Sequence, residues 1–510
     1  MTAGKRIVLN IVATYGRSLY ALAVGLFCSR WTLIALGQTD FGLFGLIGGL
    51  ITIFGTINSL LISANSRFFA FSMGGEEECR KWFNAALFMH LVFPGLVLLV
   101  FYAAGMWAIN NWLVIPDDRM TACTWVFRFT CVSAFVLMTT VPFYAMFAAK
   151  QRFAELTVYG FAQSTLHIVV IYFMLTHPRD WLAAYAGWMC MLESVPAVLI
   201  SARALRVFPE CRIVPKHFLA CDRLRKILSY VFWRAFAELG MIFSVQGIQV
   251  VANKYFGSLM NASVSISNKV LAHAGSLTAC TGTAFQPVIA SAYGEGDMDK
   301  VRMYAFRTTK LSLVFAAVFA VPLILEMQQV LDLWLKTPPP CASGLCICVL
   351  LAFVFEKAAY GQRLAVEASG RIARYQLCLG LCQVAALLVA WLLVACSFGV
   401  RGIGVALIAG AAVNAAIGLA FASRIVGMGV WHWFRSQLLP ACSSVCVALS
   451  AGLAVRLLVP AGAGRIPLTA LAFEAVFVPL VWFCMLDDRE REYLREKVLA
   501  HVVGFSPARR

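Results

Sequence analysis

The sequence predicts an all-α integral membrane protein with about fourteen transmembrane helices, arranged as two pseudo-symmetric six-helix lobes and a C-terminal helix pair. Of its 510 residues, 61% are hydrophobic and only 13% are charged, which is outside the range of soluble globular proteins. A membrane-spanning helix needs about 20 mainly apolar residues. Stretches of that length recur at approximately 8–36, 41–72, 82–110, 120–147, 156–176, 181–202, 227–253, 262–292, 308–334, 342–364, 375–399, 402–423, 438–458 and 466–486.

The first of these stretches is expected to remain in the mature protein. It carries Arg17 and is longer than the hydrophobic region of a signal peptide. The 17 cysteines are scattered among the spans without a CxxC pair, which is typical of small apolar packing residues. We therefore predict no metal site. Cys341, Cys346 and Cys348 form the one cluster that deviates from this scatter.

The net charge of +17 has a topological explanation. If the N-terminus is cytoplasmic, the inner connections and the tail carry most of the Lys and Arg residues outside the spans, as the positive-inside rule requires. Both termini are then predicted to be cytoplasmic. The same charge attracts anionic headgroups of the phospholipid bilayer, so it gives no indication of nucleic-acid binding.

A basic connection divides the predicted spans into two halves. Residues 1–202 form the predicted N-lobe, 203–226 a basic cytoplasmic linker and 227–423 the C-lobe. The halves share a weak repeat, in which an Arg within a span precedes a Phe-Gly pair. The two remaining segments are an accessory helix pair at 438–486 and a charged cytoplasmic tail at 487–510.

Cationic side chains within the apolar segments are the main functional signal. A Lys or Arg at the centre of a membrane helix costs roughly 2.5 to 3.5 kcal/mol, so it persists mainly where it faces a wet cavity, a partner or an anionic ligand. Arg128 can pair across helices with Glu193, whereas no acidic residue lies at helical spacing from Arg17 or Lys269. The predicted substrate-binding cations of the lumen are Arg17, Lys269, Arg234, Arg67 and Arg30.

Arg30 and Arg67 also have a structural explanation, because they lie near predicted span ends and can reach the membrane surface. Arg234 and Glu238 lie at i and i+4, so mutual neutralisation competes with ligand contact. Arg17 and Lys269 lack such an explanation. Because they belong to opposite predicted lobes, we expect them to face one another across a cavity.

Polar residues recur at helical spacing on four of the predicted spans, which suggests a hydrated lumen. Alternatively, Ser and Thr bond their own backbone or join neighbouring helices, and Gly45 with Gly49 is expected to serve close packing. The predicted lumen stripe consists of Asn10, Thr52, Thr56, Ser59, Ser63, Gln249, Asn253, His273, Ser276 and Thr283.

Two carboxylates of the second half are candidates for coupling transport to an ion. Glu238 and Glu356 fall within predicted spans and can bind a cation or a proton. An ion-paired helix is the competing interpretation for Glu356, because Arg363 and Glu367 lie on the same helix face. We predict no cofactor, and the coupling ion, H⁺ or Na⁺, stays open.

The first third of the chain resembles a known family. The segments SRWTLIALGQTDFGLFGLIGG (29–49), SRFF (66–69), MWAINNWLVIPDDRMTACTWV (106–126) and VPFYAMFAAKQRF (141–153) are similar to bacterial polysaccharide-biosynthesis transporters of the MATE-like MOP superfamily. That group is related to Wzx-type oligosaccharide flippases and lipid II flippases. The resemblance implies two six-helix lobes around a central cavity, and it places the protein in the bacterial cytoplasmic membrane.

The resemblance further implies a non-enzymatic, alternating-access flippase for a polyprenyl (undecaprenyl) diphosphate-linked oligosaccharide in surface polysaccharide or O-antigen biosynthesis. By position, Arg17 and Lys269 are its expected diphosphate ligands. We expect a monomer, with association with glycan-assembly machinery left open. The alternatives are a cation-coupled multidrug or metabolite antiporter, for which the basic lumen is unsuited, and a membrane glycan polymerase or acyltransferase, for which no catalytic constellation is visible.

Overall fold

The computed structural model describes residues 3–48, 51–72, 75–150, 152–370, 372–488 and 490–492. Within these ranges the side chains are described except at 3–19, 21–22, 51–54, 56, 60, 63, 67, 70–71, 153–154, 221, 226, 228–239, 277, 279–280, 283–284, 287 and 291. The described backbone is helical and contains no β-strand, which confirms the predicted all-α class.

The long helices follow the predicted spans in order along the chain. They are α1 (Ala3–Gly48), α2 (Ile51–Phe71), α3 (Glu76–Asn111), α4 (Met120–Thr139), α5 (Val141–Ala149), α6 (Phe153–Thr176), α7 (Leu182–Val207), α8 (Cys221–Phe256), α9 (Ser258–Gly294), α10 (Met298–Leu335), α11 (Ala342–Lys357), α12 (Tyr360–Ala368), α13 (Ala373–Leu393), α14 (Val400–Val426), α15 (Val430–Trp433), α16 (Leu439–Leu458) and α17 (Arg465–Leu480). Short 3₁₀ turns occupy Asp117–Arg119, Pro209–Cys211 and Pro215–His217, and π-helical turns occupy Val394–Phe398, Phe434–Leu438 and Val481–Met485.

The chain is a multi-pass membrane protein. Over the described residues, 9 helices are long and apolar enough to cross a membrane, and α11 with α12 adds one more if the bent pair is counted as a single span. The other predicted spans fall on α1, α2, α8 and α9, parts of which lie outside the described residues. The predicted count of about fourteen therefore stays a prediction.

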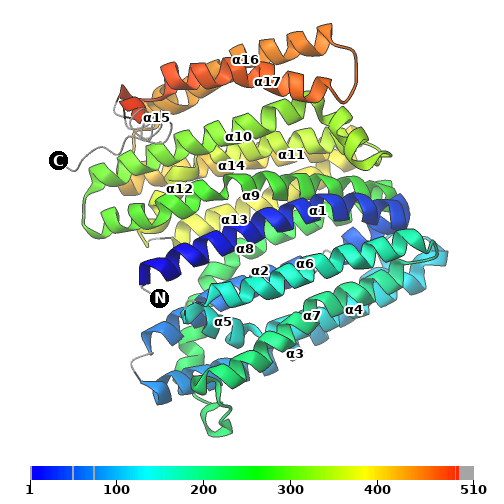
Figure 1. Cartoon of the computed structure of the whole chain (residues 1–510), viewed down its shortest axis with the longest axis vertical. Helices are drawn as coiled ribbons and strands as arrows, with labels where there is room; N and C mark the ends of the chain where they lie inside the picture. Colours follow the sequence, from blue (N-terminus) through cyan, green and yellow to red (C-terminus); the bar gives the residue numbers. More distant parts are fainter. Residues whose placement is uncertain are drawn as a thin grey trace. The chain divides into compact units, whose positions relative to one another are not determined.

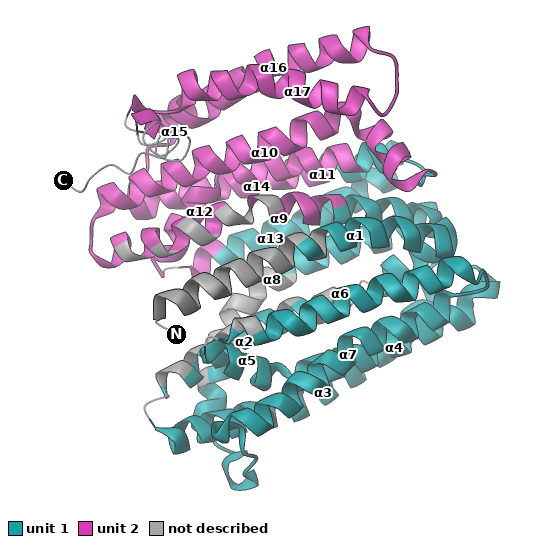
Figure 2. Ribbon diagram, in the orientation of Figure 1, with its two compact units in different colours: residues 1–269, 337–345, 376–406 teal, residues 270–336, 346–375, 407–510 magenta. Residues whose placement is uncertain are grey.

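Two compact units divide the structure. Unit 1 comprises residues 1–269, 337–345 and 376–406, and unit 2 comprises 270–336, 346–375 and 407–510 (Figure 2). The bounds of these units differ from those of the predicted lobes, which stay a prediction. Arg17 and Lys269, which belong to opposite predicted lobes, both fall in unit 1.

Helices of unit 1 pack in neighbouring pairs, with α1 on α6, α4 on α7, α2 on α5 and α3 on α4. In Figure 1, α3, α4, α6 and α7 run side by side. One part of the core is rich in aromatic rings, because Phe69, Phe83 and Phe147 are fully buried and Phe143 meets Phe83 edge-on at 5.3 Å between ring centroids. Burial of these rings stabilises unit 1, because the free energy gained by removing their apolar surface from water or lipid offsets the conformational entropy that the rings lose.

The first predicted connection, at 37–40, coincides with a break in helical geometry inside the range of α1. Gly37 adopts φ 78° and ψ 170°, and α1 then continues to Gly48. This break supports the predicted connection, because glycine reaches a positive-φ conformation without a Cβ clash and the backbone leaves helical geometry there. The polar residues that follow Gly37, among them Asp40, lie at the bend.

Two other predicted spans are broken in the structure. The span predicted at 120–147 divides at Thr140, where α4 ends and α5 begins with Pro142 in its first turn. Proline has no N–H to continue the hydrogen-bond ladder of α4, which explains the break. The span predicted at 342–364 bends by 49° between α11 and α12.

Small residues allow α1 and α9 to approach closely within unit 1. A Cβ added at Gly45 would overlap the hydroxyl of Ser265, and one added at Gly42 would overlap the backbone carbonyl of Ser258. The prediction that Gly45 serves close packing is confirmed. Such contacts are the usual means by which membrane helices gain dispersion energy in a solvent that is itself apolar.

A buried asparagine holds the basic connection between the predicted halves. The Asn84 side chain on α3 is fully buried and donates to the carbonyls of Arg80 at 2.8 Å and Arg212 at 2.9 Å. Its amide oxygen accepts from the Val214 N–H at 2.7 Å. One side chain therefore satisfies two backbone groups of the connection that would otherwise be buried without partners.

We expect Asn84→Ala to destabilise the basic connection by about 2 kcal/mol, because it leaves the Val214 N–H and the Arg212 carbonyl unsatisfied. The measurement is the rate of limited trypsin cleavage after Arg212 in the detergent-solubilised protein, which should rise. Asn111→Ala is the matched control on the same helix, because Asn111 is exposed and bonds only to the Trp107 carbonyl. Equal cleavage rates for the two variants would contradict the prediction.

In unit 2, α10 packs against α12, α16 and α17, and Figure 1 shows α16 and α17 side by side. A buried ion pair links the accessory helices to α10: the Arg465 guanidinium donates to Glu326 Oε2 at 2.8 Å. The start of the tail also contacts α10, because Lys310 donates to Glu490 at 2.8 Å. Glu326 and Lys310 of α10 thus hold the accessory helix α17 and the start of the tail, respectively.

Candidate functional site

Lys269 lies in a niche of unit 1 that we call the Lys269 niche, formed by Cys28, Ser29, Phe41 and Lys269 itself. Three of these residues come from α1, and Lys269 comes from α9. The lysine is partly buried, whereas Cys28, Ser29 and Phe41 are buried. The close approach of α1 to α9 at Gly45 and Ser265 brings these segments, distant in the sequence, together.

Among the side chains that the structure describes, the ammonium of Lys269 has one hydrogen bond. It donates to Ser29 Oγ at 2.9 Å and lies 5.0 Å from the centroid of the Phe41 ring. Ser29 in turn donates to the Gly25 carbonyl at 2.6 Å, so its lone pairs are directed to the lysine. Over the described side chains, Lys269 forms no ion pair. An ammonium has three donors, so two remain for a ligand or water.

A second polar contact lies on the helices next to α1. His167 Nε2 on α6 is 3.3 Å from the Tyr185 hydroxyl on α7, and the Tyr185 ring lies 4.8 Å from the Phe44 ring of α1. These contacts fix α6 and α7 against α1 near the niche. Sequence reasoning missed Ser29, Cys28 and Tyr185, because each resembles an ordinary packing residue of an apolar helix.

The other predicted cations are only partly described. Arg17 lies in α1, Arg67 in α2 and Arg234 in α8, and the side chains of all three fall outside the described residues. Arg30 follows Ser29 on α1 and is partly buried. Substrate-binding roles for these arginines stay predictions.

Two residues of the predicted lumen stripe join elements within unit 1. Gln249 donates to Ser265 Oγ at 3.2 Å, which connects α8 with α9. Asn253 is fully buried, accepts from the Val114 N–H at 2.7 Å and donates to the Val114 carbonyl at 3.0 Å. Both amides therefore bind protein groups in this structure, and their lumen role stays a prediction.

The rest of the predicted stripe is exposed or undescribed. Ser59 on α2 is exposed and His273 on α9 is partly buried. Ser276 is exposed and donates to the Ala272 carbonyl of its own helix at 2.9 Å. The remaining predicted stripe residues have side chains outside the described residues: Asn10, Thr52, Thr56, Ser63 and Thr283.

Of the two candidate coupling carboxylates, only Glu356 is described, because the Glu238 side chain falls outside the described residues. Glu356 is exposed and lies 3.6 Å from the Arg363 guanidinium, measured from Oε1 to Nη1. Arg363 also donates to Glu367 at 3.1 Å. The ion-paired interpretation of this helix face thus has geometric support, and ion coupling through Glu356 stays a prediction.

The suggested pairing of Arg128 with Glu193 is wrong. Arg128 is exposed and stacks on the Trp125 ring one turn away, with 5.0 Å from its guanidinium carbon to the ring centroid. A cation–π contact on the same helix is reached without a second helix, which explains why the cross-helix ion pair does not form.

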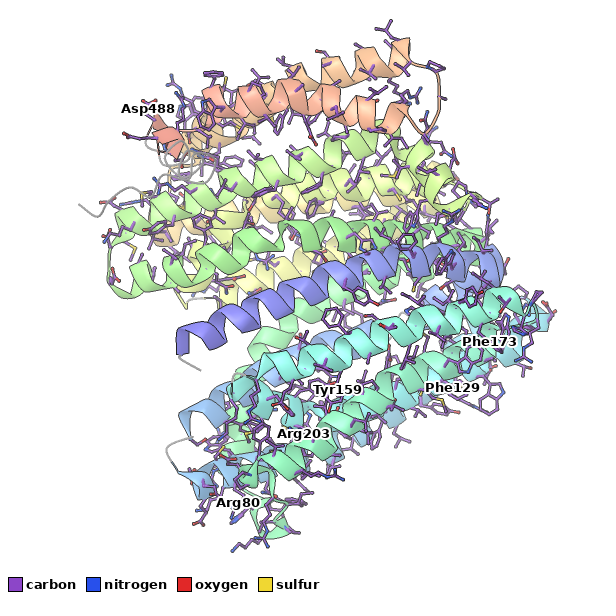
Figure 3. All side chains as sticks on the ribbon, viewed as in Figure 1. Arg80, Phe129, Tyr159, Phe173, Arg203 and Asp488 are labelled. Carbon is purple, nitrogen blue, oxygen red and sulfur yellow. The ribbon has the colours of Figure 1, made fainter. Side chains whose placement is uncertain are left out.

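Two arginines of unit 1 mark one end of its helices. Figure 3 shows Arg80 on α3 and Arg203 on α7 towards one end of the helices, and Phe129 on α4 and Phe173 on α6 towards the other. Charged side chains at a helix end can remain in water while the apolar segment lies in lipid. The end with Arg80 and Arg203 is the one predicted to be cytoplasmic, and that orientation stays a prediction.

The comparisons with known proteins identify the fold. Residues 235–355 match the family model described as MatE. The structure is similar to an inward-facing multidrug resistance MATE transporter of the MOP superfamily, with a TM-score of 0.66 and 18% identity over 81% of this chain and 94% of that chain. The chain has the MATE-like fold of the MOP superfamily. The predicted resemblance to that superfamily is confirmed, while its polysaccharide branch stays a prediction.

Two further structures show how broadly this MOP fold is shared. The lipid II flippase MurJ, in an inward closed conformation, has a TM-score of 0.66 and 12% identity over 96% of this chain and 100% of that chain. A MOP superfamily transporter from Pyrococcus furiosus, described as having a binding pocket of reverse polarity, has a TM-score of 0.60 and 17% identity over 82% and 94% of the chains. No curated protein matches this sequence.

Proposed function

We propose that this MOP-fold protein is a non-enzymatic flippase that moves a polyprenyl (undecaprenyl) diphosphate-linked oligosaccharide across the bacterial cytoplasmic membrane by alternating access, for surface polysaccharide or O-antigen biosynthesis. The observation that carries the proposal is the Lys269 ammonium, which lies within an apolar helix bundle and is bonded to one neutral hydroxyl. An unneutralised cation of this kind is suited to an anionic substrate rather than to a cationic drug.

In this proposal the Lys269 niche holds the diphosphate. Ser29 orients the ammonium by accepting one of its hydrogen bonds, and the Phe41 ring stabilises the charge while the niche is empty. The two remaining donors of Lys269 then bind phosphate oxygens, with Arg17 as the predicted second cation. The polyprenyl chain stays in the bilayer, because transfer of its apolar surface into water is unfavourable.

Further parts of the proposal concern the cellular setting. The protein works as a monomer in the inner membrane with both termini in the cytoplasm, and association with glycan-assembly machinery is an open extension. H⁺ or Na⁺ is the coupling ion, if one is used. The MOP fold supports this transport role and equally supports the alternative of a cation-coupled MATE-type antiporter of drugs or metabolites.

Reconstitution distinguishes these functions. Purified protein in liposomes is supplied with an undecaprenyl-diphosphate-linked oligosaccharide, and flipping is followed as the change in the fraction of glycan accessible to an added glycosidase. We expect protein-dependent flipping and no extrusion of a cationic dye under H⁺ or Na⁺ gradients. Gradient-driven dye extrusion without glycan movement would support the antiporter, and release of transferred glycosyl or acyl groups would support an enzyme.

A further inference from the structure

A buried lysine occupies the bend between α11 and α12, in unit 2. Lys357 is the last residue of α11, and α12 begins at Tyr360 after a bend of 49°. Its side chain and backbone together are only 9% exposed. The bend therefore places an ammonium inside a helical region where charges are costly.

Two aromatic rings enclose this ammonium without supplying a hydrogen-bond acceptor. Lys357 Nζ lies 4.9 Å from the centroid of the Phe353 ring and 4.4 Å from that of the Tyr360 ring. Across the part of the chain that the structure describes, Lys357 forms no hydrogen bond and no ion pair. All three N–H donors are available, and a buried donor without an acceptor is unfavourable.

The acidic residues on either side of the bend pair with another cation. Glu356 and Glu367 both face Arg363, with atom separations of 3.6 Å and 3.1 Å respectively. The carbonyl that follows Lys357 is also occupied, because Ala358 accepts from the Trp433 indole N–H at 2.9 Å. The groups next to Lys357 in sequence therefore leave its ammonium without an acceptor.

The structure around the bend is firmly held. The Gly361 N–H donates to Thr309 Oγ1 at 3.1 Å, and Thr309 donates to Gln362 at 2.7 Å. These bonds fix the first turn of α12 against α10, beside the lysine. Helix N-termini favour negative charge, so the start of α12 adds to the attraction that Lys357 exerts on an anion.

We propose that Lys357 and the first turn of α12 form a second anion-binding site for a phosphate-type group, separate from the Lys269 niche. The bound group is the diphosphate of the transported lipid or the headgroup of an anionic phospholipid, and both present the same oxygens to the ammonium. In the absence of the anion, Phe353 and Tyr360 stabilise the cation. The inference goes beyond the proposed function, which uses Lys269.

The test uses the full chain in phosphatidylcholine nanodiscs. Inorganic pyrophosphate is titrated into it, and binding is measured by isothermal titration calorimetry. We expect two classes of site in the wild type, with the second weakened on the order of tenfold or more in Lys357→Gln. Lys300→Gln is the control, because Lys300 is exposed and already paired with Asp297. Unchanged pyrophosphate binding in Lys357→Gln would overturn the inference.

Comparison with Lys269→Gln separates this inference from the proposed function. If Lys269→Gln loses one class of site and Lys357→Gln loses the other, the result supports both the Lys269 niche and the Lys357 site. Two remaining classes in Lys269→Gln would contradict the proposed diphosphate niche alone. A single class in the wild type that only Lys269→Gln removes would contradict the second site alone.

Competition experiments identify the source of the anion, and a stability measurement tests whether Lys357 is needed only for folding. Competition by phosphatidylglycerol in the nanodisc indicates a lipid headgroup, whereas competition by geranyl diphosphate alone indicates the transported diphosphate. Lys357→Met keeps the apolar stem and removes the charge, so the melting temperature should stay equal or rise. A lower melting temperature together with unchanged pyrophosphate binding would show that Lys357 is structural.

Discussion

Lys269→Gln is expected to lower the rate of glycan flipping by roughly 10- to 100-fold while the protein still inserts in the membrane. The variant removes a charge-assisted contact to phosphate, and such contacts contribute about 1.5–3 kcal/mol. Glutamine can still bond to Ser29, so the packing of α9 against α1 should persist. The measurement is the initial flipping rate in liposomes, normalised to the amount of inserted protein.

Two variants complete this experiment. Lys269→Arg keeps the charge and should retain most of the flipping rate, although the longer fork fits the Ser29 hydroxyl less well. Lys254→Gln is the control in the same unit, because Lys254 is exposed in the last turn of α8. A wild-type rate in Lys269→Gln would exclude the Lys269 niche as the diphosphate site.

Arg465→Met is expected to destabilise the protein by about 3–5 kcal/mol, because it leaves the Glu326 carboxylate buried without its counter-ion. The Glu326 side chain is 1% exposed, and its second oxygen accepts only the Thr469 hydroxyl, at 3.0 Å. Accessory helix α17 should then separate more readily from α10. The measurement is unfolding in mixed micelles of increasing sodium dodecyl sulfate content, followed by tryptophan fluorescence.

The double variant Glu326→Leu with Arg465→Met tests the cause. Replacing both charges by apolar groups should restore most of the stability, since the cost arises from the unpaired carboxylate rather than from a lost attraction. Lys81→Met is the control, because Lys81 pairs with the exposed Glu77 on the first turn of α3 and should change stability by less than about 0.5 kcal/mol. Equal instability of the single and double variants would contradict this explanation.

Much of the fold was predictable because lipid imposes a simple rule on sequence. Backbone groups in a membrane must bond within the segment, so an apolar stretch of sufficient length becomes a helix. Each predicted span accordingly falls on helical residues of the structure, although the spans at 41–72, 120–147 and 342–364 are each divided between two helices. The differences occurred at Thr140 and at the bend after Lys357, where a continuous apolar stretch did not reveal that the helix breaks.

Part of the site was predictable for the same reason. Lys269 was selected because it is a cation without an acidic residue at helical spacing, and the structure leaves it with a neutral partner. Lys357 was not among the predicted site residues. Only the structure shows that Glu356 lies 3.6 Å from the Arg363 guanidinium, while the Lys357 ammonium lies beside two aromatic rings.

The sequence by itself determined that this protein is an all-helical, multi-pass membrane protein with cations inside its spans. The tertiary structure decided which groups those cations meet: Ser29 for Lys269, aromatic rings for Lys357 and Trp125 for Arg128. The physical reason is one of range. Hydropathy and helical spacing describe one helix at a time, so they do not show that Ser29, 240 residues from Lys269 in the sequence, accepts its hydrogen bond, nor which nearby ring a cation contacts.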